Sequence, residues 1–146
     1  MRVTTWAEYG LLVAVHLARR GQDAPVPARD VAERERLPVD FVEQILLRLR
    51  RAQLVESRRG ARGGYVLARP PAEVSVREIL EATENRTFEV NCDVRRLDEA
   101  RCGVESECSV RPVWMELRNR VDAFLGGVSL ADLVRPEAEV RELVQA

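Results

Sequence analysis

Apolar residues recur at helical spacing near the start of the chain and predict a helix over residues 5–20. Thr5 and Glu8 stand at the spacing of a capping box at its start. The strongly apolar face of this helix is made by Leu12, Val13, Leu17 and their neighbours. Such a face requires other elements to pack against it.

Two shorter helices are predicted over residues 28–36 and 39–53, separated by the helix-breaking Pro38. Two extended runs follow, residues 54–57 and 65–68, with a turn rich in arginine and glycine between them. Glycine permits the positive φ values that the tip of a hairpin needs. A first helix, two short helices and then a hairpin is the order of a winged helix-turn-helix.

The middle of the chain contains one more helix and then a long segment without periodicity. The helix is predicted to begin after Ser75 and to run to about residue 83, with Ser75 and Glu78 at capping-box spacing. Apolar residues then become sparse from residue 84 to residue 108. So long a loop is unusual in a compact domain, and a bound inorganic centre could order it.

A long helix is predicted over residues 112–125, ended by two glycines. Ser129 and Asp132 then cap a last short helix, and Pro136 starts a polar tail. The apolar stripe of the long helix could simply belong to the core, but a helix that follows a complete winged helix needs a surface of its own to cover it, and a dimer would supply one. The stripe consists of Val113, Trp114, Leu117, Val121 and Phe124.

The predicted fold class is mainly α with a small β-hairpin. We expect a winged helix-turn-helix DNA-binding unit over residues 1–83 and a cysteine-bearing loop over residues 84–110. The dimerisation helix and a C-terminal helical tail are expected over residues 111–146. A length of 146 residues suits one domain with an appended arm.

Composition narrows the class of protein. An apolar fraction of 46% with 32% charged residues is typical of a globular chain. No run approaches the roughly 20 apolar residues of a membrane span. The N-terminus lacks a secretory signal, so we expect a cytoplasmic protein without a membrane partner. No catalytic set or phosphate loop is recognisable, so neither an enzyme nor a small-molecule substrate is expected.

Charge is distributed unevenly along the chain. Residues 1–70 carry 13 arginines against 8 acids, whereas residues 71–146 carry 10 arginines against 16 acids. The basic excess is greatest around the predicted hairpin. Arginine suits phosphates and base edges because its planar fork donates two parallel hydrogen bonds. Together with the order of elements, this distribution predicts that the protein binds double-stranded DNA.

All three cysteines, Cys92, Cys102 and Cys108, lie in the segment without periodicity. Thiolates are the usual ligands of iron–sulfur clusters, and one loop can wrap one cluster. The spacing alone is neither a paired zinc motif nor a ferredoxin run. A zinc-binding repressor, a metal-free thiol-sensing repressor and a cluster-bearing electron carrier therefore remain open, although the last would not need a basic hairpin.

Several motifs resemble the family of bacterial iron–sulfur winged-helix transcription regulators that includes IscR, NsrR and RirA, and IscR most of all. They are MRVT at residues 1–4, FVEQILLRLR at 41–50, RGARGGYVL at 59–67 and SLADLV at 129–134. The resemblance implies a homodimeric regulator with a 2Fe-2S or 4Fe-4S cluster that senses cluster status, iron, redox stress or nitric oxide. Iron–sulfur assembly genes are the implied targets, and a nitric-oxide-sensing repressor of stress genes is the alternative.

The resemblance also assigns cluster ligands. Cys92, Cys102 and Cys108 would supply three thiolates, with a longer gap between the first two than in similar regulators. Arg111 replaces the histidine that IscR has after its last cysteine, and arginine is a poor ligand. Glu8 matches the carboxylate that NsrR takes from the partner subunit. His16 is expected to be a packed side chain.

The expected DNA contacts lie on the third helix and the hairpin. Gln44 can form paired hydrogen bonds with adenine. Glu43 can accept a hydrogen bond from cytosine, or it can lower the affinity for incorrect DNA sites. In IscR the glutamate that matches Glu43 separates two classes of site. Arg59 matches a DNA-contacting arginine of IscR. The full expected set is Asp40, Glu43, Gln44, Arg48, Arg58, Arg59 and Arg62.

Overall fold

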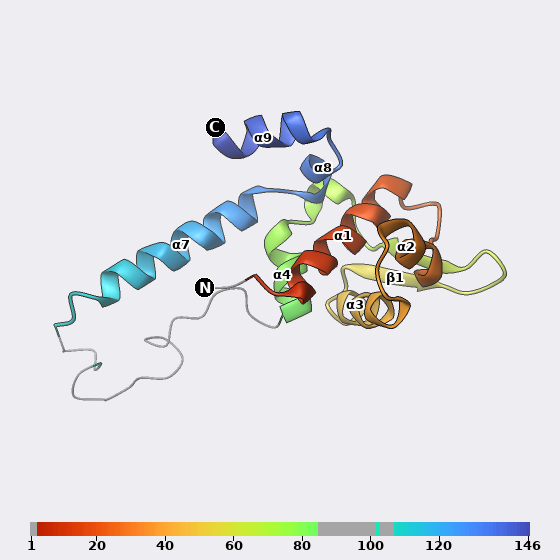
Figure 1. Ribbon diagram of the computed structural model, residues 1–146, viewed down its shortest axis with the longest axis horizontal. Coiled ribbons are helices and arrows are strands. Elements are labelled where there is room, and N and C mark those ends of the chain that lie inside the picture. Colours follow the sequence, from red (N-terminus) through yellow and green to blue (C-terminus); the bar gives the residue numbers. More distant parts are fainter. Residues whose placement is uncertain (1–2, 85–101, 103–106) are drawn as a thin grey trace.

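The computed structural model describes residues 3–84, 102 and 107–146. Its described part is mainly helical with one two-stranded antiparallel hairpin, which confirms the predicted fold class (Figure 1). The first three helices are α1 (Thr5–Arg20), α2 (Ala28–Glu35) and α3 (Val39–Arg51), and each packs against the other two.

One apolar core holds these helices and the hairpin together. Helix α3 buries the side at i, i+3, i+4 and i+7 that its periodicity predicts, and α1 buries Val13 and Leu17. Leu12, expected on the same apolar face, is instead 44% exposed, because it points to the side of α1 that carries Glu8. The fully buried larger side chains are Leu17, Ile45, Leu46, Leu49, Ile79, Leu130, Val13, Val31, Val42, Val55, Val66 and Val74.

Strands β1 (Val55–Arg58) and β2 (Gly64–Leu67) form the predicted hairpin, which projects beyond α2 (Figure 1). Near its tip, β2 is hydrogen-bonded to the turn between α1 and α2, through the amides and carbonyls of Val26 and Tyr65 at 3.0 and 2.8 Å. Gly64 lies so close that a Cβ there would come within 2.5 Å of the Val26 carbonyl carbon. Only glycine fits this position.

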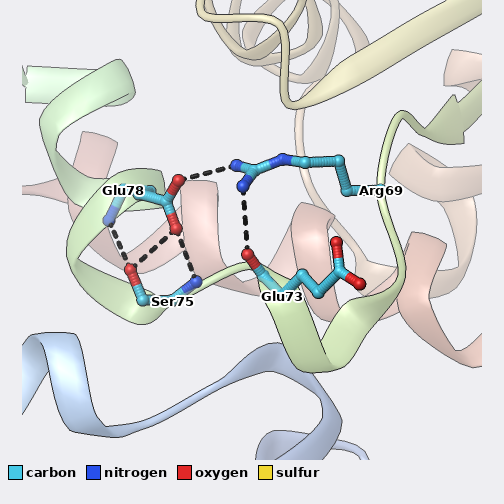
Figure 2. Close-up of polar contacts among 4 residues, drawn as sticks. All are labelled: Arg69, Glu73, Ser75 and Glu78. Carbon is cyan, nitrogen blue, oxygen red and sulfur yellow. Dashed lines mark hydrogen bonds and ion pairs between the residues drawn. The ribbon is translucent and has the colours of Figure 1, made fainter.

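A short 3-10 helix, η1 (Pro71–Glu73), leads into α4 (Val76–Glu84). The predicted capping box is present, because the Ser75 hydroxyl accepts from the Glu78 amide and the Glu78 carboxylate accepts from the Ser75 amide. Arg69, just after β2, donates to the same carboxylate at 2.6 Å and to the Glu73 carbonyl (Figure 2). Burial raises the pKa of Glu78, but the bonds from Ser75 and Arg69 outweigh it and lower the pKa overall.

The start of α1 differs from its prediction. Thr4, not Thr5, occupies the N-cap position, and neither side chain makes a capping bond there. The Thr4 hydroxyl donates instead to Glu84, at the far end of α4. The proposed Thr5–Glu8 capping box is therefore wrong, because Thr5 is already the first helical residue and a capping side chain belongs to the residue before it.

Ser75→Ala is expected to lower the free energy of unfolding by about 1 kcal/mol and the melting temperature by roughly 2–4 °C. Thr5→Ala is the matched control and should change little. Folding lowers the pKa of Glu78, so its bonds stabilise the protein fully at pH values above the pKa that Glu78 has in the unfolded chain. This stabilisation is lost as the pH falls through the lower pKa that Glu78 has in the folded protein. The gap between wild type and Ser75→Ala in thermal melts should close on acidification. Equal losses in both variants would contradict the capping assignment.

The C-terminal part consists of α7 (Arg111–Gly127), α8 (Leu130–Leu133) and α9 (Glu137–Gln145). Helix α7 packs against α4, and its N-terminal end extends away from α3 and the hairpin (Figure 1). After α7 the chain returns to the segment before α4, where the Leu130 amide donates to the Val74 carbonyl. The predicted Ser129–Asp132 capping box is formed at the start of α8. The predicted division of the chain into parts at residues 83 and 110 stays a prediction. Leu130, from the C-terminal part, lies in the same main core as α1 and α3.

The polar segment after Pro136, expected as part of a C-terminal helical tail, forms α9. Proline stands at the N-cap position, where its missing amide costs nothing. Leu143 packs against a second, smaller apolar cluster made by Ala7, Val76, Leu80 and Val128. The few apolar residues of this segment are therefore sufficient to attach a helix to the body of the protein.

Candidate nucleic-acid interface and cysteine segment

Helices α2 and α3 are joined by a turn in which Arg36 takes a left-handed conformation, with φ 55° and ψ 42°. The Leu37 amide donates to the Ala32 carbonyl across this turn. Because α3 buries one side against the core, its opposite side faces solvent and can enter a groove. The Asp40, Glu43 and Gln44 side chains are all exposed on that side.

Arg51 lies in the middle of the same exposed side and was missed by the sequence prediction. It is exposed, and it stands seven residues after Gln44 along α3. Seven residues are close to two helical turns, so Arg51 lies above Gln44 on one face. The periodicity that placed Gln44 was therefore a sufficient signal for Arg51.

The tip of the hairpin carries three exposed arginines, Arg58, Arg59 and Arg62. A hydrogen bond of 2.9 Å from the Gly63 amide to the Gly60 carbonyl closes the tip. Gly60 has φ 116°, a value that side chains rarely allow. Within the described residues no carboxylate pairs with these three guanidinium groups, which leaves them available to phosphates.

Arg48, also predicted to contact DNA, makes its described contacts within the protein. Its guanidinium carbon is 3.9 Å from the centroid of the Trp6 ring, and Nη1 donates to the Thr83 carbonyl. The side chain is half-buried between α1, α3 and α4. Arg48 follows Gln44 by about one helical turn, but its guanidinium is held by Trp6 and Thr83.

The cysteine segment is only partly described. Cys92 lies outside the described residues, and Cys102 and Cys108 are both half-buried just before α7. The Arg111 side chain donates to the Cys102 carbonyl at 3.2 Å, and its amide donates to the Cys108 carbonyl at 3.3 Å. Among the described residues, no three side chains of the metal-binding types come together.

Glu8 and His16 both belong to α1 but differ in burial. Glu8 is exposed in the first turn, and nothing in the described part of the chain bonds its carboxylate. His16 is 6% exposed, as predicted, with Nδ1 2.7 Å from the Glu35 carboxylate. Within one chain, α1 lies in the body of the fold while the two described cysteines precede the extended end of α7 (Figure 1).

No helix in the described ranges has the length and apolar character needed to cross a membrane.

A core-mounted helix with an exposed polar side, next to an arginine-tipped hairpin, defines a winged helix-turn-helix DNA-binding protein. Comparison with known proteins gives the family. The chain belongs to the Rrf2 family, described as iron-dependent transcriptional regulators, whose model matches residues 3–136. Its relatives are transcription regulators and not enzymes.

Three of these similarities are particularly informative. A helix-turn-helix regulator of Azotobacter vinelandii, ORF2, is 36% identical over 146 residues, which are 99% of this chain and 85% of that protein. The structure of T. potens IscR superposes with a TM-score of 0.72 and 30% identity, covering 92% of this chain and 86% of that one. The structure of CymR, the global cysteine regulator of B. subtilis, superposes with a TM-score of 0.75 and 29% identity. The similarity covers 92% of this chain and 96% of that one.

Proposed function

We propose that the protein is a cytoplasmic, homodimeric transcription regulator that uses an iron–sulfur cluster to control its binding to DNA. The exposed side of α3 would read bases in the major groove, and the hairpin would contact the flanking backbone or minor groove. Cluster status is the proposed signal, and iron–sulfur assembly genes are the proposed targets. The observation that carries the proposal is the set of three cysteines in a chain of the Rrf2 family.

The side chains present suit such a cluster. Cys92, Cys102 and Cys108 would hold it through thiolates, and Glu8 of a second subunit would supply an oxygen ligand. An exposed Glu8 carboxylate without a partner among the described residues is consistent with this role. Arg111 is unsuitable as a ligand, but its bond to the Cys102 carbonyl fixes the backbone beside a thiolate. When bound, a cluster supplies iron whose ligands and redox state respond to the environment.

The exposed side chains of α7 support the proposed dimer. All residues of α7 are described and none is buried. Val113, Trp114 and Phe124 are 64%, 43% and 53% exposed on the predicted stripe. Large apolar side chains gathered on one side of a projecting helix are typical of an interaction surface. A two-fold dimer would bury this stripe against itself and provide two DNA-reading units.

The proposal is tested by the metal content of protein purified without oxygen. We expect brown protein that contains iron and acid-labile sulfide, and whose affinity for DNA changes when the cluster is removed. Iron, sulfide and zinc are measured together, with DNA binding followed by fluorescence anisotropy. Colourless protein with stoichiometric zinc would overturn the cluster assignment while leaving the DNA-binding role intact.

A metal-free thiol sensor is the second candidate, favoured by the similarity to CymR. In that case the cysteines would form a disulfide or another oxidised product, and DNA binding would follow the thiol redox state. Colourless protein without zinc, whose DNA affinity changes with oxidant and recovers with a dithiol, would establish this alternative. Mass spectrometry of alkylated protein would then identify the oxidised cysteines.

Arg59→Ala is expected to weaken DNA binding and to reduce the salt dependence of the association constant by about one unit of logarithmic slope, because one phosphate contact is lost. If Arg59 enters a narrow minor groove, the loss should be greatest at sites with A·T-rich flanks. Arg141→Ala on α9 removes the same charge far along the chain and is the control. Unchanged affinity and slope would remove Arg59 from the interface.

A further inference from the structure

Arg48 is a basic residue of the recognition helix whose contacts lie inside the protein. Its guanidinium lies over the Trp6 ring of α1, at 3.9 Å from the ring centroid, and donates to the Thr83 carbonyl of α4. A cation over an indole is attracted by the ring, more strongly when water is excluded. One side chain of α3 is thus bonded to two other helices at once.

Trp6 is itself fixed by α3. Its ring stacks on Phe41, with centroids 4.1 Å apart and planes 27° apart. Phe41 in turn meets the edge of Tyr9 at 5.4 Å. Because Phe41 lies in the first turn of α3 and Arg48 two turns later, Trp6 contacts α3 at two separate points. The position of α3 therefore depends on the position of Trp6.

The end of α4 is held equally closely. Thr83 is fully buried, and its hydroxyl donates to the Ile79 carbonyl at 3.0 Å. Gly10 of α1 faces it so closely that a Cβ there would come within 2.6 Å of Thr83 Cγ2. The next residue, Glu84, accepts from the Thr4 hydroxyl. The final two residues of α4 therefore contact both α1 and α3, immediately before the segment that contains Cys92.

We propose that Arg48 is a positioning residue, which transmits displacements of the end of α4 to the recognition helix and does not itself contact DNA. The inference rests on the proposed DNA-reading role of α3. Shifts of 1–2 Å between packed helices are a common form of switching, and bonds to base edges tolerate only about 0.5 Å. A change at Thr83 would therefore alter base contacts through Arg48, without any change in the charge of the interface.

Arginine is required for this role because its flat guanidinium can lie on an aromatic ring and donate from its edge at the same time. Lysine keeps the positive charge but concentrates it on one ammonium group. Arg48→Lys should consequently preserve attraction to phosphates while weakening the connection between Trp6 and Thr83. The salt dependence of DNA binding should then stay unchanged.

A double-mutant cycle between Gly10→Ala and Arg48→Lys tests the connection. The added methyl group of Gly10→Ala displaces Thr83 directly, so no metal is needed. The DNA probe is a duplex enriched from a random library by the wild-type protein. We expect Gly10→Ala to weaken binding about tenfold in the wild-type background and less than threefold in the Arg48→Lys background, since coupled residues are non-additive.

The control is a second double-mutant cycle in which Arg50 is mutated and Arg48 is kept. Arg50 is an exposed arginine on the same helix, and its side chain bonds only Ser57 among the described residues. Gly10→Ala and Arg50→Lys should be additive. Additivity in the Arg48 cycle would overturn the proposal. A fall of about one in the salt slope of Arg48→Met would also overturn it, because that is the signature of a direct phosphate contact.

Tryptophan emission provides a readout without DNA. In a Trp114→Phe background Trp6 is the remaining tryptophan. Its emission should change with Arg48→Lys and with Gly10→Ala, and stay constant with Arg50→Lys. An emission unaffected by Gly10→Ala would overturn the proposal even if the variants bind DNA poorly. If the wild-type protein enriches no duplex at all, the proposed function itself fails, a result distinct from an additive cycle.

Discussion

Aspartate in place of Trp114 or Phe124 is expected to convert the proposed dimer to a monomer. Both side chains are large, apolar and about half exposed on one side of α7. Aromatic residues at the centre of an interface commonly contribute 2 kcal/mol or more, so each substitution should raise the dimer dissociation constant at least about 30-fold. Sedimentation equilibrium over a range of concentrations measures this constant directly.

The stability of the monomer should be preserved, because neither side chain belongs to the buried core. Asn119→Asp introduces the same charge on the opposite, exposed side of α7 and should leave the dimer intact. Affinity for a DNA site with two half-sites should fall together with the dimer, since a monomer occupies only one half-site. Unchanged sedimentation of both aspartate variants would require a different surface for self-association.

Serine in place of any one of the three cysteines is expected to abolish stable cluster binding. Three protein thiolates are already the minimum that leaves a single iron open to another ligand, and serine is a far weaker ligand for iron. Iron and acid-labile sulfide should fall close to zero, and the visible absorption should disappear. Ser109→Ala, next to Cys108, is the control that disturbs the segment without removing a thiol. A variant that keeps full iron content would exclude its cysteine as a ligand.

Glu8→Ala in the same measurements should keep the iron but alter the visible spectrum and make the cluster less stable. Thr5→Ala cannot serve as the comparison for a capping effect, since Thr5 makes no cap. Glu139→Ala is better matched, because Glu139 is also an exposed acid in the first turn of a helix. A spectrum identical to wild type would assign the fourth position to water, a small thiol or another acid.

Local patterns in the sequence were sufficient for most of the fold. The period of α3 identified its buried side, and the pairs Ser75–Glu78 and Ser129–Asp132 identified two helix starts. These features depend on residues three or four positions apart. Thr5 failed as a cap because Thr4 occupies the N-cap position, and the Thr4 hydroxyl bonds Glu84, 80 positions away. Contacts across such distances leave no periodic signal in a single sequence.

The site was predicted less completely for the same reason. Exposure of Gln44 and of the hairpin arginines follows from local pattern, and so does the exposure of Arg51. Arg48 could not be placed, because Trp6 and Thr83 are brought to it only by the packing of α1 and α4 on α3. The role of Glu8 depends on a second subunit, which the pattern within one chain cannot specify.

The hydrogen bonds between Val26 and Tyr65, with the close approach at Gly64, determine how far the hairpin can move relative to α3. The hairpin cannot swing on its own without breaking those bonds. The distance from α3 in the major groove to the hairpin tip is consequently fixed. Each base pair inserted between the half-site and the flanking DNA that the hairpin contacts would move that flanking DNA by about 3.4 Å. The operator should therefore tolerate substitutions in its flank far better than it tolerates insertions between the flank and the half-site.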